Sequence, residues 1–149
     1  MKPIDIKTLL HSQEGSEIKV KITDNLRNLV FLAGVNGKEI DGEIKVIKIN
    51  DCLLATGRLN CDLRLICDRC LEEVDQKTPI RLESCYYIDR KEHPAEEFLV
   101  DKYGQIDLTE AVREEIILNT SLKNLCKSDC LGICPECGEN KNSGKCQCK

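Results

Sequence analysis

Residues 53–70 read LLATGRLNCDLRLICDRC and contain the clearest strand pattern of the chain. From Leu53 to Cys67 every second position is apolar or small, and the positions between them in the middle of the stretch are polar. A period of two predicts a long β-strand with one buried and one wet face. Cys61 is expected on the buried face as a small core residue. Cys67 ends that face, so Cys67 and Cys70 should lie at the rim of a sheet.

Neighbouring segments predict partner strands for this one. Residues 18–22 and 40–46 alternate apolar and charged side chains. Residues 74–86 do the same after the turn, which predicts an antiparallel partner, and Pro79 within them indicates an edge strand or a bulge. The apolar parity changes at Ile47, which predicts a β-bulge or a bend there.

Two dipeptides predict turns, and a helix follows further along the chain. Asn36-Gly37 and Asn50-Asp51 are typical turn sequences. Residues 88–106 have little periodicity, and we expect a surface loop. Asp107 should cap a helix, with Glu110 closing a capping box. Its predicted apolar face is formed by Leu108, Ala111, Val112, Ile116 and Leu118.

The whole chain is therefore predicted as an α+β protein with one main helix. An antiparallel β-rich domain, either a sheet or a partly open barrel, is expected over residues 1–105. The helix segment, residues 106–125, should pack on it. A Cys-rich zinc knuckle is expected over residues 126–149.

The tail, residues 126–149, reads CKSDCLGICPECGENKNSGKCQCK and carries most of the chemistry. Eight of the 11 cysteines fall into four close pairs, Cys67/Cys70, Cys126/Cys130, Cys134/Cys137 and Cys146/Cys148. Paired cysteines in a chain without a signal peptide predict structural zinc rather than disulfides, because cytosolic thiols are kept reduced. We expect two zinc ions in a cytoplasmic protein.

The four pairs can be sorted in two ways. In the arrangement we favour, Cys134, Cys137, Cys146 and Cys148 hold one ion locally, and Cys126/Cys130 join Cys67/Cys70 in a long-range staple. The alternative places Cys126, Cys130, Cys134 and Cys137 around one ion. Cys52, Cys61 and Cys85 have no close partner in the sequence and are expected as buried or partly exposed thiols.

Several function classes have little support. The chain lacks phosphate-binding and nucleophile-elbow motifs, and its two histidines, His11 and His93, lie in polar surroundings. All-cysteine sites leave no open position for catalysis, so we expect no enzyme. No segment approaches the length of an apolar membrane span, and residues 1–17 show no signal-peptide pattern. The formal charge of −4 disfavours strong binding of phosphates by bulk charge.

Several motifs together resemble one family. They are Gly57-Arg-Leu, Cys67-Asp-Arg-Cys70-Leu71, Ile106-Asp107-Leu108 with the helix ending at Leu118, and the segment Gly132 to Asn140, which reads GICPECGEN. This pattern is similar to the YceD-type family, the large ribosomal RNA subunit accumulation proteins of bacteria and plastids. The resemblance covers essentially the whole chain.

The resemblance implies a non-catalytic role in accumulation of 23S ribosomal RNA and assembly of the large ribosomal subunit. It also implies that the Cys67/Cys70 site is shared in the family and that the Cys134–Cys148 knuckle is an addition. Candidate partners are pre-50S particles, 23S rRNA or ribosomal proteins. The candidate contact residues are Arg69, Lys127, Lys141 and Lys145, with Lys123 and Lys149 nearby. The competing hypothesis is a zinc- or thiol-redox-responsive regulator, in which oxidation of a cysteine site releases metal.

Overall fold

The computed structural model describes residues 1–27, 29, 31, 34–89, 91, 98–121, 123–144 and 146–148. The elements are β1 (Ile4–Asp5), α1 (Lys7–Leu10), β2 (Glu17–Asn25), β3 (Val35–Ile49), β4 (Cys52–Ile66), β5 (Glu73–Tyr87), β6 (Gln105–Ile106), α2 (Thr109–Asn119) and a 3-10 turn, η1 (Lys141–Ser143). His93, Lys145 and Lys149, which the sequence analysis named, lie outside the described residues.

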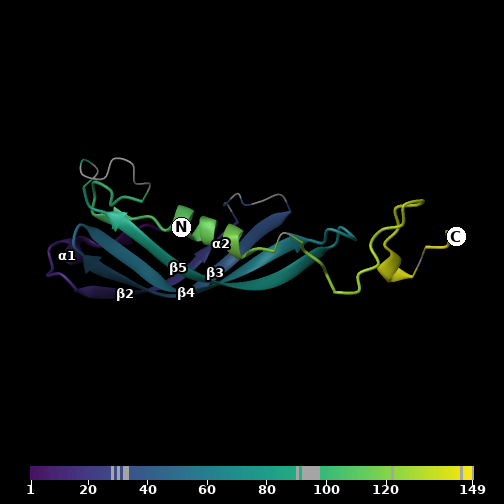
Figure 1. Ribbon diagram of the computed structural model, residues 1–149, viewed down its shortest axis with the longest axis horizontal. Helices are drawn as coiled ribbons and strands as arrows, with labels where there is room; N and C mark the ends of the chain where they lie inside the picture. Colours follow the sequence, from purple (N-terminus) through teal and green to yellow (C-terminus); the bar gives the residue numbers. More distant parts are fainter. Residues whose placement is uncertain are drawn as a thin grey trace.

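A four-stranded antiparallel sheet in the order β2-β3-β4-β5 forms the body of the protein. The sheet is open, with β2 and β5 at its edges. Of the two predicted forms, a sheet or a partly open barrel, the structure therefore has the sheet. Figure 1 shows α2 lying across one face of this sheet, while the Cys-rich tail extends beyond its far end. The protein is therefore α+β, with one main helix and a separate cysteine cluster at the C-terminus.

Strand β4 has the predicted alternation. Leu59, Cys61, Leu63 and Leu65 are fully or almost fully buried, and the polar residues between them face outward. β5 pairs with β4 without interruption from Cys52↔Tyr87 to Ile66↔Glu73. Pro79 falls on an edge strand, where its missing N–H leaves no ladder bond broken inside the sheet.

Helix α2 covers the core face of the sheet. Ala111, Val112 and Ile116 are buried in the main core, but Leu118 is 77% exposed, so its assignment to the apolar face was wrong. The helix begins one residue later than expected, with Leu108 at the N-cap position. Asp107 instead accepts a hydrogen bond from the Thr109 N–H at 2.9 Å, a local turn that leads into the helix.

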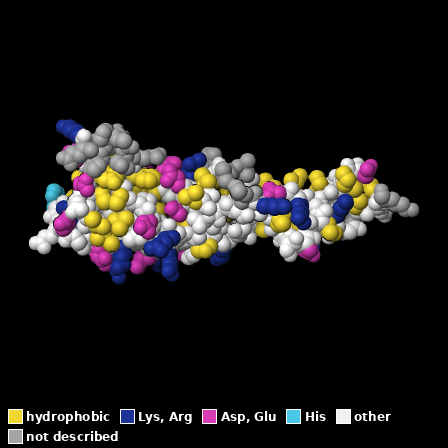
Figure 2. Space-filling view, viewed as in Figure 1, with side chains coloured by type: hydrophobic (Ala, Val, Ile, Leu, Met, Phe, Trp, Pro, Cys, Tyr) yellow, Lys and Arg dark blue, Asp and Glu magenta, His cyan; other side chains and the backbone are white. Residues whose placement is uncertain are grey.

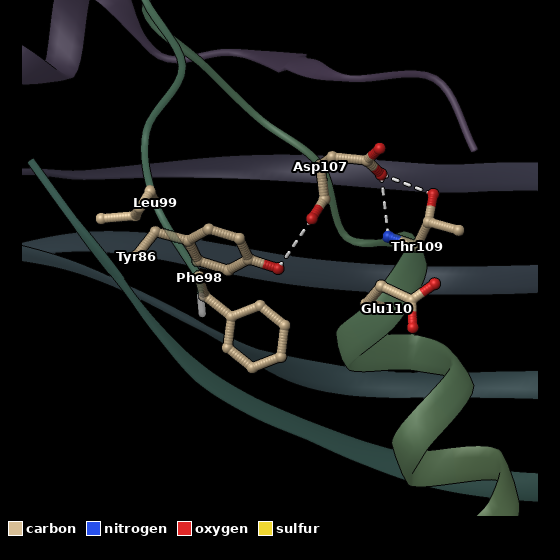
Figure 3. A pocket seen from close by; sticks show the side chains of 6 residues that line it. All are labelled: Tyr86, Phe98, Leu99, Asp107, Thr109 and Glu110. Atoms are coloured by element: carbon tan, nitrogen blue, oxygen red, sulfur yellow. Dashed lines mark hydrogen bonds between the residues drawn. The ribbon is translucent and has the colours of Figure 1, made fainter. Parts of the chain in front are cut away.

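Tyr86 ties β5 to the start of this helix (Figure 3). Its hydroxyl donates to the Asp107 carbonyl at 3.0 Å, and its ring packs on Phe98 with centroids 5.5 Å apart. Burial raises the pKa of Tyr86, so the hydroxyl remains a donor. A small open hollow of about 260 Å³ lies between these groups and Glu110.

Of three local predictions, two were wrong and one is confirmed. Asn36 and Gly37 lie inside β3 rather than in a turn. A Cβ on Gly37 would come within 2.4 Å of the Leu26 side chain, so this position needs glycine for the close packing of Leu26. The bulge falls between Gly37 and Glu39, and the β3–β4 register is continuous through Ile47. Asn50-Asp51 forms the predicted turn, and Asn50 adopts a φ of 49° there.

The expected loop over 88–106 is partly ordered into strand pairing. Gln105 and Ile106 form β6, which pairs antiparallel with β1. Leu99 makes a parallel bridge to Tyr87. These short contacts bring the N-terminus beside the residues that precede α2. Among the helices that the structure describes, none is long and apolar enough to cross a membrane.

Candidate metal centres

Two groups of four cysteines lie at the end of the sheet and in the tail. The sheet-edge cluster comprises Cys67, Cys70, Cys126 and Cys130, and the tail cluster comprises Cys134, Cys137, Cys146 and Cys148. Within each cluster the four sulfur atoms lie within 4.8 Å of one another. This grouping is the one that the sequence favoured over the local alternative.

The sulfur spacing fits a tetrahedral zinc ion. Four sulfurs placed at the usual Zn–S distance of about 2.3 Å lie about 3.8 Å apart. The observed separations are 3.8 Å for Cys67 and Cys130, 3.6 Å for Cys70 and Cys126, and 3.7 Å for Cys137 and Cys146. Disulfide bonding needs about 2.05 Å, so these clusters have the dimensions of metal sites.

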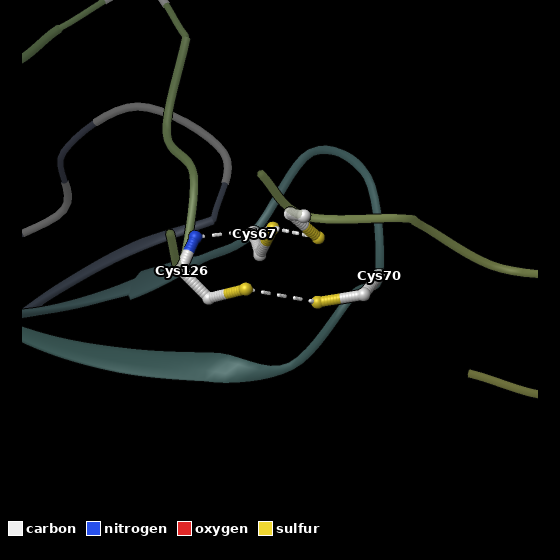
Figure 4. Close-up of side chains that lie close together, drawn as sticks. Cys67, Cys70 and Cys126 are labelled. Carbon is white, nitrogen blue, oxygen red and sulfur yellow. Dashed lines mark hydrogen bonds between the residues drawn. The ribbon is translucent and has the colours of Figure 1, made fainter. Parts of the chain in front are cut away.

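The sheet-edge cluster joins segments that are distant in the sequence (Figure 4). Cys67 follows β4, and Cys70 lies in the turn that leads to β5. Cys126 and Cys130 arrive from the segment after α2, and the Cys126 N–H donates to the Cys67 sulfur at 3.3 Å. Cys67, Cys70 and Cys130 are buried, with at most 4% of their surface exposed.

The two Cys-x-x-Cys turns share one backbone pattern. The Cys67 N–H donates to the Glu72 carbonyl and the Leu71 N–H to the Cys67 carbonyl, both at 2.9 Å. In the tail the Cys134 N–H donates to Glu139 at 2.8 Å and the Gly138 N–H to Cys134 at 2.9 Å. Leu71 in the first turn is therefore equivalent to Gly138 in the second, and both have a positive φ, 61° and 73°.

These turns aim backbone N–H groups at sulfur and shift the thiol pKa values. Burial acts to raise the pKa of Cys67, but N–H groups of Cys70, Cys126 and Arg69 outweigh it and bring the pKa to about 6. N–H groups of Cys137 and Glu136 likewise lower the pKa of Cys134 to about 6.

Other sulfurs in the same clusters shift in the opposite direction. The neighbouring Cys130 sulfur, followed by burial, raises the pKa of Cys126 to about 12. Cys137 does the same for Cys148, whose pKa is also about 12. Four adjacent thiolates repel one another, so each cluster without a cation must keep some protons. A divalent ion removes this conflict.

The tail cluster also contacts the sheet-edge cluster through the loop between Cys137 and Cys146. Asn142 donates from Nδ2 to the Cys130 sulfur at 3.3 Å, and its Oδ1 accepts the Leu131 N–H at 3.0 Å. Asn140 reaches back to the Glu72 carboxylate at 2.6 Å. The sequence patterns gave no signal that these asparagines reach the sheet-edge cluster and Glu72.

The candidate partner-binding residues are placed unevenly. Arg69 is exposed, but its guanidinium donates a hydrogen bond to the Cys130 carbonyl at 2.9 Å. This bond helps to hold the segment that carries Cys130 at the sheet-edge cluster. Lys127 and Lys141 are exposed beside the two clusters. Lys145 lies outside the described residues, so its position relative to these groups remains a prediction.

Of the three remaining cysteines, Cys61 is fully buried in the core as predicted. Cys52 is buried and Cys85 is partly exposed, as predicted, but the sequence spacing did not show that the two side chains meet. They lie on the neighbouring strands β4 and β5, and their sulfurs are 2.7 Å apart.

Residues 55–149 match the family model described as large ribosomal RNA subunit accumulation protein YceD. The chain belongs to this family. The matched region contains nearly all of β4, β5, helix α2 and all eight cysteines of the two clusters. The comparison therefore agrees with the family that the sequence motifs indicated.

Curated relatives are found in mycobacteria. Uncharacterized proteins of Mycobacterium bovis and Mycobacterium tuberculosis are 27% identical over 116 residues, which is 74% of this chain and 55% of theirs. One from Mycobacterium leprae is 28% identical over 108 residues, or 68% of this chain and 49% of its own length. The chain thus spans about half the length of these relatives. No solved structure matches it.

Proposed function

We propose that this protein is a non-catalytic, zinc-binding factor that supports accumulation of 23S ribosomal RNA and assembly of the large ribosomal subunit. The observation that carries the proposal is the match to a family described by large-subunit ribosomal RNA accumulation, over a region that includes both cysteine clusters. A ribosomal role also favours a cytoplasmic location.

Zinc is the proposed ion in both clusters. Sets of four cysteine thiolates select zinc or iron–sulfur chemistry, and the sulfur spacing suits a single tetrahedral ion. When bound, zinc supplies charge neutralisation and a fixed ligand geometry. With all four positions taken by sulfur there is no open position for a substrate, which favours a structural role over catalysis.

The division into a β-rich domain (1–105), a helix segment (106–125) and a zinc-binding tail (126–149) remains our proposal. The β6 strand spans the first boundary, so the first two parts should behave as one folding unit. Limited proteolysis of the Cys137→Ser variant, which keeps the four cysteines of the sheet-edge cluster, tests this, because only the tail should be cut rapidly.

The proposed contact with pre-50S particles, through 23S rRNA or a ribosomal protein, lies on the tail and the region that joins it to the sheet. Figure 2 shows Lys and Arg side chains over this region, with Asp and Glu among them. Lys127 and Lys141 are exposed there, but Asp129 and Glu136 dilute the positive charge. Few phosphates can be neutralised by such a surface, so a ribonucleoprotein should bind more tightly than naked RNA.

Co-sedimentation with large-subunit precursors tests the proposal. The double variant Lys127→Glu/Lys141→Glu should no longer co-sediment with the precursors, and it should still bind two zinc ions. The matched control is Lys19→Glu/Lys21→Glu, which makes the same charge change on exposed positions of β2. Crosslinking that recovers no ribosomal RNA or ribosomal protein from the parent would refute the proposed function. Loss of binding only in the control would move the contact surface to the sheet.

One observation favours the alternative, a zinc- or thiol-redox-responsive regulator. Cys137 and Cys148 of the tail cluster are exposed, so an oxidant can reach them while the metal is bound. The two hypotheses separate on one measurement. An assembly factor should sediment with precursors whatever its thiol state, whereas a regulator should lose or gain that binding when oxidation releases zinc.

A further inference from the structure

A pair of cysteines outside both metal clusters lies at the open end of the β4–β5 hairpin. Cys52 is the first residue of β4, and Cys85 lies near the end of β5. Cys52 faces Tyr87 across the ladder, and Cys85 faces Leu54. Since side chains alternate between faces, Cys52 and Cys85 are diagonal neighbours on one face of the sheet.

Their sulfur atoms are closer than those of either metal cluster. The separation is 2.7 Å, against 3.6 Å or more for the sulfur contacts within the clusters. Two unbonded sulfurs are normally further apart, whereas a disulfide needs about 2.05 Å. The pair lacks the additional ligands that a tetrahedral metal site would require, since neither residue belongs to a metal-ligating group among the described residues.

We propose that Cys52 and Cys85 form a two-cysteine oxidation site, in which a peroxide converts the two thiols to a disulfide that closes the open end of the β4–β5 hairpin. The other end of this hairpin is closed by the turn that holds Cys67 and Cys70. The proposal does not depend on the metal clusters or on the ribosomal role.

The two cysteines differ in access, and this difference sets the order of the steps. Cys85 is partly exposed, whereas Cys52 is 7% exposed. Burial, followed by the contact with Cys85, raises the pKa of Cys52 to about 12, so Cys52 is a protonated thiol at neutral pH. Cys85 is therefore the sulfur that meets the oxidant first.

The reaction balances with hydrogen peroxide as the oxidant. The Cys85 sulfur attacks one peroxide oxygen, the O–O bond breaks, and Cys85 sulfenic acid and water are formed. The Cys52 sulfur then attacks the Cys85 sulfur, an S–S bond forms, and the hydroxide that leaves takes the Cys52 proton as a second water. Two thiols lose two electrons and two protons, and one peroxide is reduced to two waters.

Tryptic mapping reads this site without interference from the other cysteines. Cleavage after Lys48, Arg58, Arg81 and Arg90 places Cys52 in peptide 49–58 and Cys85 in peptide 82–90, each with no second cysteine. The metal-loaded full chain is treated with one equivalent of hydrogen peroxide, alkylated and digested without reductant. We expect peptides 49–58 and 82–90 to be disulfide-linked in most chains and released again by dithiothreitol.

Two variants and a stability measurement complete the test. Cys85→Ser should abolish the linked peptide, and Cys85→Ala is the second choice if that variant folds poorly. Cys61→Ser should retain the linked peptide, because Cys61 is buried in the core on the opposite face of β4 from Cys52. The urea midpoint of the parent should rise on oxidation, and that of Cys85→Ser should not. Alkylated Cys52 and Cys85, or a Cys85 sulfinic acid without the linked peptide, would overturn the proposal, as would an unchanged or lower midpoint of the linked protein.

Discussion

Replacing Asn142 by alanine should weaken metal binding at a cluster to which Asn142 contributes no ligand. The side chain lies in the loop of the tail cluster, yet its Nδ2 donates to the Cys130 sulfur at 3.3 Å. Burial acts to raise the pKa of Cys130, but the Asn142 hydrogen bond and the Gly132 N–H outweigh it and leave the pKa below its ordinary value. The alanine variant removes that hydrogen bond and the acceptor for the Leu131 N–H.

The expected size follows from outer-shell residues of other metal sites. Loss of a hydrogen bond to a ligand typically costs about 10–100-fold in metal affinity, or about 1.4–2.7 kcal/mol. The affinity of the sheet-edge cluster should fall by this factor, while that of the tail cluster, whose sulfurs Asn142 does not contact in any described hydrogen bond, should change by less than about threefold.

Competition with a chromophoric chelator measures the two affinities, and alkylation assigns them. As the first ion leaves Asn142→Ala, the peptides containing Cys67, Cys70, Cys126 and Cys130 should be labelled before those of the tail. Ser143→Ala is the matched control, because Ser143 bonds to the Asn140 carbonyl in the same loop and not to sulfur. Parental affinities at the sheet-edge cluster would refute this reasoning. Earlier labelling of the tail would mean that Asn142 only shapes its own loop.

Four further predictions follow from the same geometry. Elemental analysis of reduced protein should give two zinc ions per chain, and the zinc affinity of both clusters should fall as the pH is lowered, more steeply below about 6, where Cys67 and Cys134 also take up protons. Cys70→Ser should lower the thermal stability of the whole domain, because structural zinc contributes on the order of 10 kcal/mol, whereas Cys137→Ser should mainly unfold the tail; equal melting of both would contradict the two clusters' separate roles. Leu71→Gly should leave stability unchanged or raise it by up to about 1 kcal/mol in urea unfolding, and Gly138→Leu should cost the tail about 1–2 kcal/mol, since only glycine adopts the left-handed conformation without strain. Binding to naked RNA should weaken with salt at a logarithmic slope of about −2 to −4 in filter-binding titrations, and a steeper slope would indicate a contact surface larger than the tail.

Much of the fold was readable from local patterns. The alternation from Leu53 to Cys67 and the helix that starts near Asp107 both repeat with the period of a single element. Such periods depend on backbone geometry and on one buried face, which neighbouring residues specify by themselves. The Cys-x-x-Cys turns and the family motifs were equally local, and the family match over residues 55–149 agrees with them.

Contacts between distant segments were not readable in this way. Asn36-Gly37 has a turn sequence but lies inside β3, because Leu26 packs against the glycine, and β1 pairs with β6 across a hundred residues. Sequence spacing favoured one assignment of the cysteine pairs without excluding the other, whereas the approach of the chain after α2 to the sheet edge decided it.

The main strands and helix, the pairing of cysteines along the chain and the family can thus be predicted from the amino-acid sequence alone. The contacts of Cys52 with Cys85 and of Asn142 with Cys130 are seen only in the folded chain. The physical reason is that side-chain period is a property of one strand or helix. The register between strands and the contacts between distant segments depend instead on which surfaces are buried together, and the packing of the whole chain determines this.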